Sequence, residues 1–435
     1  MNSLATKLVR RYQQTVALLT VMLLVGCSTS TFESHTPTET LAERTPSPIV
    51  TSSPIVASPT IEETVLPPEN ILQYQLLEIS PELPSDVKPT DSLVIWSDPL
   101  QLIRFGPQVH LETIPGVDRN ANCLTTSPDG KWLAYCPVSN DSPTGQLLVV
   151  QSADGHQQKK IPLDMYLHNV GAYGFPPWLD NQHLIFLRLV PNEYPHEGYP
   201  IVVINPFTGK HSKLVSNYPD FQRSPAGPAG HMDFGYSDLV YDPSLNLVIY
   251  PSAIGGSYIV LWDRQAKSAL AKVEVAIGYY PLWSPDAKQF VVPLLVPKQS
   301  DNIIEEWFRV SRDGQVEQLT HFGDFFVSSE VSAEYSWSPD SQKLAFWLDV
   351  SPSLCSGMNL AILDIPSKQV TNTCIPGRPG YPLSPIWSLD NRFIAVVSSG
   401  KDSRQAILVD AKESQAFDIT NITDGSLPLG WLVSP

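Results

Sequence analysis

Four aspartates recur in the same local sequence, and they are the first residues to consider for metal binding or acid–base chemistry. They are the third residues of Ser-Pro-Asp or Ser-Leu-Asp tripeptides, at Asp129, Asp286, Asp340 and Asp390. A catalytic or metal-binding set needs carboxylates that converge on one point, whereas Pro, Asp, Gly and Asn in this arrangement are typical of tight turns. Each aspartate lies in its own copy of the motif, so we expect all four to be structural.

A possible nucleophile is Ser257, in the run Gly255-Gly256-Ser257-Tyr258. This run resembles the nucleophile elbow of prolyl oligopeptidases, but the elbow needs a glycine two residues after the serine and a helix behind it. Ile259 stands in that place and a strand-like run follows. Because no other local constellation of catalytic residues is present, we expect the protein not to be an enzyme.

The aspartate motif belongs to a larger unit of an apolar run, often ending in Trp, then the turn, then a second apolar run. The fullest copies are Ser127–Tyr135, Trp283–Val292, Trp337–Phe346 and Trp387–Val396, with degraded copies at Trp178–Phe186 and Tyr241–Ile249. Successive copies begin about 40–60 residues apart, a period typical of propellers and repeat arrays. A third apolar run and a weaker fourth one follow each copy, and four antiparallel strands per unit form a propeller blade.

This repeat resembles that of the TolB-like β-propellers of bacterial periplasmic proteins. The resemblance rests on the pattern Trp-Ser-Pro-Asp followed by an apolar run, and it covers residues 91–435. It implies an all-β propeller fold and says little about function. The small α/β domain that TolB carries before its propeller has no room here, so the resemblance does not bring TolB's partners with it.

The two ends of the repeat region predict how the ring closes. The last run, Leu427–Pro435, has the character of a first strand, and the chain then stops. Three runs before the first full copy, at 92–96, 100–104 and 109–113, supply the missing strands. We therefore predict seven four-stranded blades, one of them built from both termini; six blades is the alternative if the early runs lie outside the ring.

The N-terminus predicts export and a lipid anchor. Residues 1–26 combine basic residues with a short apolar core, as in a secretory signal peptide. The core ends in Leu24-Val25-Gly26-Cys27, which matches the bacterial lipobox, so we expect Cys27 to be lipidated. Residues 27–90 are rich in Ser, Thr and Pro and predict a disordered tether. The expected location is the periplasmic or outer side of a bacterial membrane.

Composition narrows the range of partners. The net charge is −16, and no basic cluster lies outside the signal. This acidic composition argues against binding to nucleic acid and against electrostatic binding to anionic lipid. We expect a monomer with no cofactor and no metal.

Four cysteines remain after Cys27. Cys123 and Cys136 flank one hairpin turn, and Cys355 and Cys374 bracket another. We expect two disulfides between paired strands, as suits an exported protein. The alternative is four buried thiols.

Long insertions are predicted to lie at one end of the blades. The first and third turns are short, and the long segments fall in second turns and inter-blade connections, at 191–200, 216–237, 294–305, 321–334 and 349–357. Because loops on a rigid scaffold often carry recognition, this end is the expected binding face. Its candidate residues are Tyr194, His196, Tyr218, Phe221, His231, Asp233, Phe234 and Phe325.

These features together predict a lipid-anchored envelope protein whose propeller binds or scaffolds another protein. The alternative is an envelope or extracellular glycan-binding protein, or a lyase or hydrolase acting on glycans, with a site in the central funnel. Three or more His, Glu or Asp side chains converging in that funnel would favour the enzyme.

Overall fold

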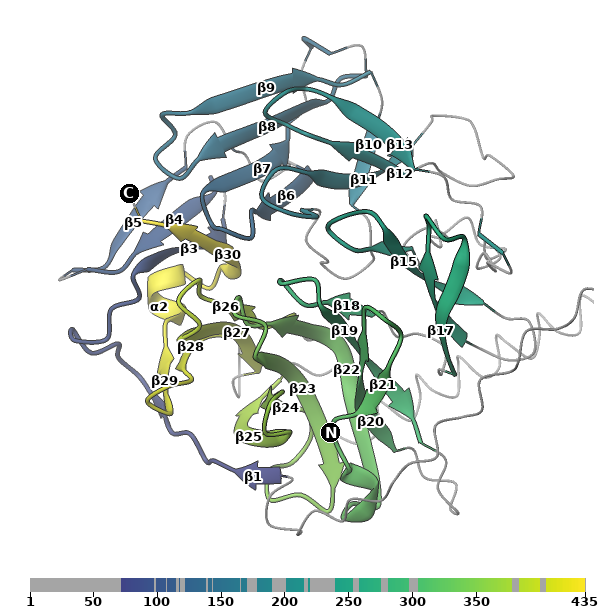
Figure 1. The fold of residues 1–435 in the computed structure, drawn as a ribbon. Coiled ribbons are helices and arrows are strands. Elements are labelled where there is room, and N and C mark those ends of the chain that lie inside the picture. The colour runs from purple at the N-terminus through teal and green to yellow at the C-terminus, as the bar shows by residue number, and fades with distance from the viewer. Residues whose placement is uncertain are drawn as a thin grey trace, which may run out of the picture. The chain divides into compact units, whose positions relative to one another are not determined.

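Seven sheets, each with four antiparallel strands and two of them with an added parallel strand, form a closed β-propeller in the computed structural model (Figure 1). The structure describes residues 72–97, 99–106, 108–114, 117, 122–137, 140–142, 144–164, 166–169, 178–189, 201–214, 218–219, 239–252, 258–274, 281–296, 304–377, 383–399 and 404–434. All of them belong to one compact unit, residues 61–435. No helix among these residues is long and apolar enough to cross a membrane.

We number the blades in chain order and give their strands from the inside of the ring outward. Blade 1 is β30 (Leu427–Val433), β3 (Asp91–Trp96), β4 (Gln101–Arg104) and β5 (His110–Thr113). Blade 2 is β6 (Asn122–Thr126), β7 (Trp132–Cys136), β8 (Leu147–Ser152) and β9 (Gln158–Pro162); blade 3 is β10 (Tyr166–Asn169), β11 (Leu184–Leu189), β12 (Ile201–Ile204) and β13 (His211–Leu214). Blade 4 is β14 (Val240–Tyr241), β15 (Leu247–Ser252), β16 (Tyr258–Asp263) and β17 (Ser268–Glu274); blade 5 is β18 (Leu282–Trp283), β19 (Gln289–Leu295), β20 (Glu305–Ser311) and β21 (Val316–Gln318). Blade 6 is β22 (Ser328–Trp337), β23 (Lys343–Ser351), β24 (Asn359–Asp364) and β25 (Gln369–Pro376); blade 7 is β26 (Ile386–Trp387), β27 (Phe393–Ser399), β28 (Arg404–Asp410) and β29 (Gln415–Asp418).

The prediction of seven blades with a shared terminal blade is confirmed. β30, at the C-terminus, pairs antiparallel with β3, so that Asp91 lies opposite Val433 and Trp96 opposite Leu427. The early runs therefore lie inside the ring, and the six-bladed alternative is excluded.

The hydrophobic core lies between the blades. The buried apolar side chains of the described residues form seven clusters, and each cluster joins two neighbouring sheets. Between blades 5 and 6, for example, the rings of Trp307 and Phe346 meet edge to face at 5.3 Å. The cluster between blades 7 and 1 contains Phe393 and Trp431. Because the succession of clusters returns to its start, the ring is continuous.

The recurring aspartates shape the first turns of blades 2, 5, 6 and 7, as expected. In the first of these turns, Ser127 Oγ donates to Asp129 Oδ1 at 2.7 Å, and the same carboxylate oxygen accepts the Lys131 N–H. The Ser127 hydroxyl also accepts the N–H of Trp132, which begins the next strand. The same three hydrogen bonds occur around Asp286, Asp340 and Asp390. The carboxylates therefore serve their own turns.

Successive turns are also bonded to one another. The N–H of Asp340 donates to Asn391 Oδ1 of the next blade at 2.8 Å, and the turns of blades 2 and 5 make the equivalent contact. Blade 1 has no such turn, because its first strand comes from the C-terminus. There Asp91 Oδ2 accepts the Leu389 N–H at 3.0 Å in its place. The side chain of Asp91 thus replaces the inter-turn hydrogen bond that blade 1 would otherwise lack.

Inner-strand tryptophans join three of the blades to the blade before them. The indole N–H donates to the carbonyl of the residue that precedes the inner-strand tryptophan of the previous blade. These hydrogen bonds join Trp337 to Leu282 (3.0 Å), Trp387 to Ser336 (3.3 Å) and Trp431 to Ile386 (3.1 Å). Trp283 is similarly buried, but its Nε1 has no hydrogen-bond partner in the described part of the chain.

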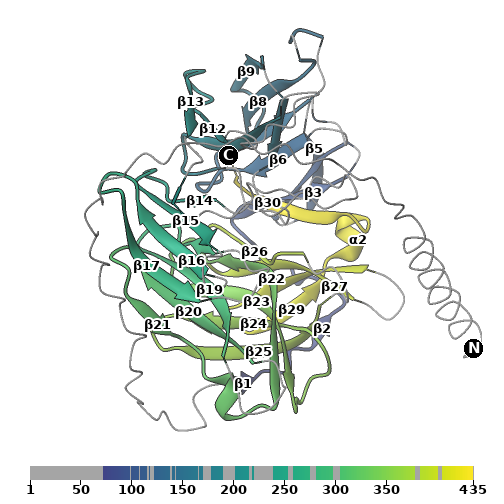
Figure 2. The ribbon, with the colours of Figure 1, turned by 90° about the vertical axis from the view of Figure 1, so that its right-hand side faces the viewer.

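The disordered tether predicted over residues 27–90 is wrong for its last part. Residues 72–90, which we call the strap, lie along the outside of blades 6 and 7 (Figures 1 and 2). In the strap, β1 (Leu72–Tyr74) pairs parallel with β25, and β2 (Ile79–Ser80) pairs parallel with β29. The apolar side chains of the strap pack on three successive inter-blade clusters: Leu72 on that of blades 5 and 6, Leu77 and Ile79 on that of blades 6 and 7, and Leu83 and Val87 on that of blades 7 and 1. Tertiary partners thus order a segment whose composition suggests disorder.

The tryptophan hydrogen bond can be measured by one substitution made at two sites. Replacing Trp337 by Phe removes its bonded N–H, and replacing Trp283 by Phe removes an N–H with no partner. We expect Trp337→Phe to lower the free energy of unfolding by about 1 kcal/mol more than Trp283→Phe does. Equal losses in urea denaturation would show that the bond contributes nothing.

Candidate binding face

The two ends of the blades differ in elaboration, as the sequence predicts, at blades 2, 3, 5 and 6, whose second turns have seven to eleven residues; those of blades 1, 4 and 7 have four or five. Where both flanking residues are described, the first turns have five residues and the third turns have four to six. Antiparallel pairing places these turns at one end of every blade, which we call the trimmed face. The second turns and inter-blade connections lie at the opposite end, which we call the elaborated face.

Of the eight predicted binding residues, Tyr218 and Phe325 lie in the described part of the chain. Tyr218 is only 9% exposed; its hydroxyl lies 3.1 Å from that of Tyr241, and its ring stacks on Tyr250. Its prediction as a surface residue is therefore wrong, because it completes the core between blades 3 and 4. Phe325 is 39% exposed and remains a candidate. The other six, Tyr194, His196, Phe221, His231, Asp233 and Phe234, lie outside the described residues, as does Cys27.

The best described part of the elaborated face lies over blades 5 and 6. The predicted loop at 321–334 is a short helix, η2 (Phe322–Asp324), followed by the beginning of β22. Ser328 already pairs with Ser351, and an isolated bridge joins Ile304 to Ser329. The segment is thus held between two blades, and the reason is that β22 and β23 extend well beyond the body of their sheet.

Two buried carboxylates at the start of β20 hold residues 320–331 by hydrogen bonds. Glu306 accepts the Gly323 N–H at 2.7 Å and the Thr320 hydroxyl at 2.6 Å. Glu305 accepts the Val331 N–H at 2.5 Å. Burial raises the pKa of Glu306 to about 6 and, with a smaller contribution from the nearby charge of Glu330, the pKa of Glu305 to about 7. Sequence reasoning missed both residues, because they lie in a strand with no motif around them.

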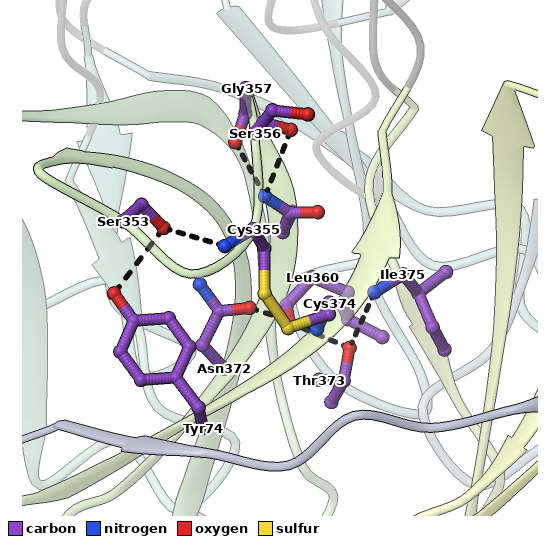
Figure 3. The surroundings of a disulfide bond; sticks show 11 residues. Tyr74, Ser353, Cys355, Ser356, Gly357, Leu360, Asn372, Thr373, Cys374 and Ile375 are labelled. Carbon is purple, nitrogen blue, oxygen red and sulfur yellow. Dashed lines mark hydrogen bonds between the residues drawn. A yellow bond between two sulfur atoms is a disulfide. The ribbon is translucent and has the colours of Figure 1, made fainter.

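A disulfide fixes the neighbouring loop, as predicted. Cys355 in the second turn of blade 6 is bonded to Cys374 in β25 (Figure 3). Ser353 Oγ accepts the Cys355 N–H at 3.1 Å and lies 3.3 Å from the hydroxyl of Tyr74 in the strap. The loop is therefore held by a covalent bond and by the strap together.

The other predicted disulfide stays a prediction. Cys123 and Cys136 lie on the paired strands β6 and β7, where Asn122 is opposite Cys136. Cys136 is buried, but the side chain of Cys123 lies outside the described residues.

Three apolar side chains are exposed to solvent on residues 321–334 and on the disulfide-bonded loop. Phe325, Val327 and Leu354 are 39%, 54% and 75% exposed. Beside them, residues 349–351 and 353–357 line an open hollow of about 460 Å³ that contains three serines and Asp349. Among the described residues, no group of three or more His, Cys, Asp or Glu is arranged to hold a metal ion.

The raised pKa of Glu306 predicts a pH dependence of stability. The folded state holds this proton more tightly than the unfolded chain, so the stabilisation is complete below pH 4.5 and is lost as the pH rises through about 6. The shift corresponds to about 2 kcal/mol. We expect Glu306→Gln to remove roughly this much of the difference in unfolding free energy between pH 4.5 and pH 8. An unchanged difference in denaturation experiments would contradict the assignment.

The similarities to known proteins are found at the level of structure. No family model matches the chain, and no curated protein is detectably similar in sequence. The structure is similar to TolB from Acinetobacter baumannii, with a TM-score of 0.39 and 13% identity over 78% of this chain and 81% of that one. It is also similar to an oligogalacturonate lyase from Vibrio parahaemolyticus (0.46, 9%, 79% and 85%) and to the β-propeller domain of the Trilobed protease from Pyrococcus furiosus (0.39, 11%, 67% and 81%). The chain resembles TolB-like β-propellers, and at these identities the resemblance is one of fold alone.

Proposed function

We propose that this protein is a lipid-anchored component of a bacterial cell envelope whose propeller binds another protein on its elaborated face and does not itself catalyse a reaction. One observation carries the proposal: Phe325, Val327 and Leu354 are exposed apolar side chains on segments that the structure holds fixed. Exposed apolar groups that are ordered before binding lose little conformational entropy when a partner covers them.

The segments that carry Phe325, Val327 and Leu354 are held by hydrogen bonds to β20 and β23 and by a disulfide. Carboxylates of β20 hold the chain at Gly323 and Val331, and the Val327 N–H donates to the Ser351 carbonyl at 2.7 Å. The disulfide holds the loop that carries Leu354. A loop that served only to connect strands would not need so many attachments.

The proposed lipid anchor is supported by the lipobox at Cys27 and by the Ser, Thr and Pro-rich segment that follows it. An acyl chain in the membrane and a flexible tether would let the propeller search for its partner from a fixed base.

A glycan ligand is the second candidate, and the hollow beside Leu354 favours it. The hollow is lined by Ser351, Ser353 and Ser356 together with Asp349. Neutral hydroxyls with one carboxylate suit a polyol, which both donates and accepts hydrogen bonds.

Replacing Cys27 by Ala tests the anchor. We expect the wild-type chain in membrane fractions labelled with palmitate, and the Cys27→Ala chain unlabelled and released from the membrane. A variant that stays labelled and membrane-bound would refute lipidation at Cys27.

Site-specific photo-crosslinking in cells tests the binding face. A photoreactive residue in place of Val327 or Leu354 should give a defined crosslink to a protein. The same residue in place of Lys412, exposed in a third turn of the trimmed face, serves as the control and should give none.

Two outcomes would overturn protein binding on this face. One is crosslinking that is as strong from Lys412 as from Val327. The other is a chain with no protein crosslink that binds a glycan on an array and loses this binding when Asp349 is replaced by Ala.

A further inference from the structure

The exposed apolar side chains of the elaborated face lie among carboxylates. We call this surface the ledge and define it by Asp324, Phe325, Val327, Glu330, Asp349 and Leu354. The ledge is continuous, because the hydrogen bond from Val327 N–H to the Ser351 carbonyl brings residues 324–330 beside residues 349–354.

Two acidic side chains face each other across the paired strands of the ledge. Glu330 of β22 lies directly opposite Asp349 of β23. Like charges in this position destabilise a sheet. Buried Glu305 is close enough to Glu330 for the charge of Glu330 to contribute to its raised pKa.

The acidic side chains of the ledge, Asp324, Glu330 and Asp349, form no ion pair with a lysine or arginine among the described residues. His321 is half-buried, and burial lowers its pKa against the opposing effect of the Asp324 charge. The trimmed face differs, because several of its carboxylates have basic partners there, as in the pairs Asp129–Lys131, Asp286–Lys288 and Asp242–Arg312.

We propose that the ledge binds a segment of a partner protein in which lysine or arginine alternates with apolar residues. This inference rests on the proposed function and adds the chemistry of the partner. The apolar residues of the partner cover Phe325, Val327 and Leu354, while its cations neutralise the Glu330–Asp349 pair. The repulsion in the free protein is then relieved in the complex, which favours the bound state.

Reversing the charge of Glu330 gives a test with two readouts. The probe is a fluorescent peptide of alternating leucine and lysine, and its binding to the detergent-solubilised full chain is followed by anisotropy. We expect Glu330→Lys to weaken binding at least tenfold. Because the substitution replaces a repulsive pair by an attractive one, we also expect the melting temperature to rise.

Glu413→Lys is the matched control. It makes the same change of charge at an exposed position of the trimmed face, and it should alter binding less than twofold. Equal weakening by the two variants would show that the peptide responds only to net charge, which overturns the inference. A Glu330→Lys chain that is more stable and binds the peptide as tightly as wild type would also overturn it.

Photo-crosslinking separates this inference from the proposed function. If the crosslink from Val327 to a partner persists in the Glu330→Lys chain at unchanged yield, protein binding on the elaborated face stands and the basic chemistry of the partner is wrong. If the crosslink disappears in that chain and remains in the Glu413→Lys chain, both are supported.

Discussion

The hydrogen bond from an inner-strand indole to the backbone of the preceding blade sets the geometry on which the ring depends. An indole N–H reaches a buried carbonyl only if neighbouring inner strands keep a fixed separation and stagger. Trp337, Trp387 and Trp431 meet this condition over three successive boundaries, including the one that joins the C-terminus to the ring. The side-chain-to-backbone bonds between turns, such as that from Asp340 to Asn391, repeat the constraint at the trimmed face. The positions of blades 5, 6, 7 and 1 are therefore specified twice, by the inner strands and by the turns.

This rigid ring allows the elaborated face to carry features that reduce stability. Glu305 and Glu306 are buried carboxylates, and Glu330 faces Asp349 across a strand pair. Each arrangement has an energetic cost, and each occurs where β20, β22 and β23 extend past the body of blades 5 and 6. At the trimmed face the buried carboxylates of Asp242 and Asp410 differ from these, because each is paired with an arginine.

The fold was largely readable from the sequence, because the repeat encodes it locally. The Ser-Pro-Asp turns, the inner-strand tryptophans and the apolar runs at both termini each predict a structural element without knowledge of distant partners. The strap was not readable, since β1 and β2 pair with strands about 300 residues away and their few apolar residues follow no period. Tyr218 shows the same limit, because its sequence context gives no sign that Tyr241 and Tyr250 surround it. Glu305 and Glu306 could have been noticed as a pair of acids opening an apolar strand, but their partners Thr320, Gly323 and Val331 lie 14 to 26 residues further along the chain.

The direction of the strap has a mechanical consequence. β1 runs parallel to β25, and Leu72 is opposite Val370, close to the third turn of blade 6, so the strap begins at the trimmed side of this blade. A pull on the first residue of the strap toward the trimmed side acts along β1 and loads its backbone hydrogen bonds together, in shear, instead of peeling them apart singly. If the lipid anchor is the fixed point, a partner that draws on the elaborated face would tighten this attachment along its strongest axis.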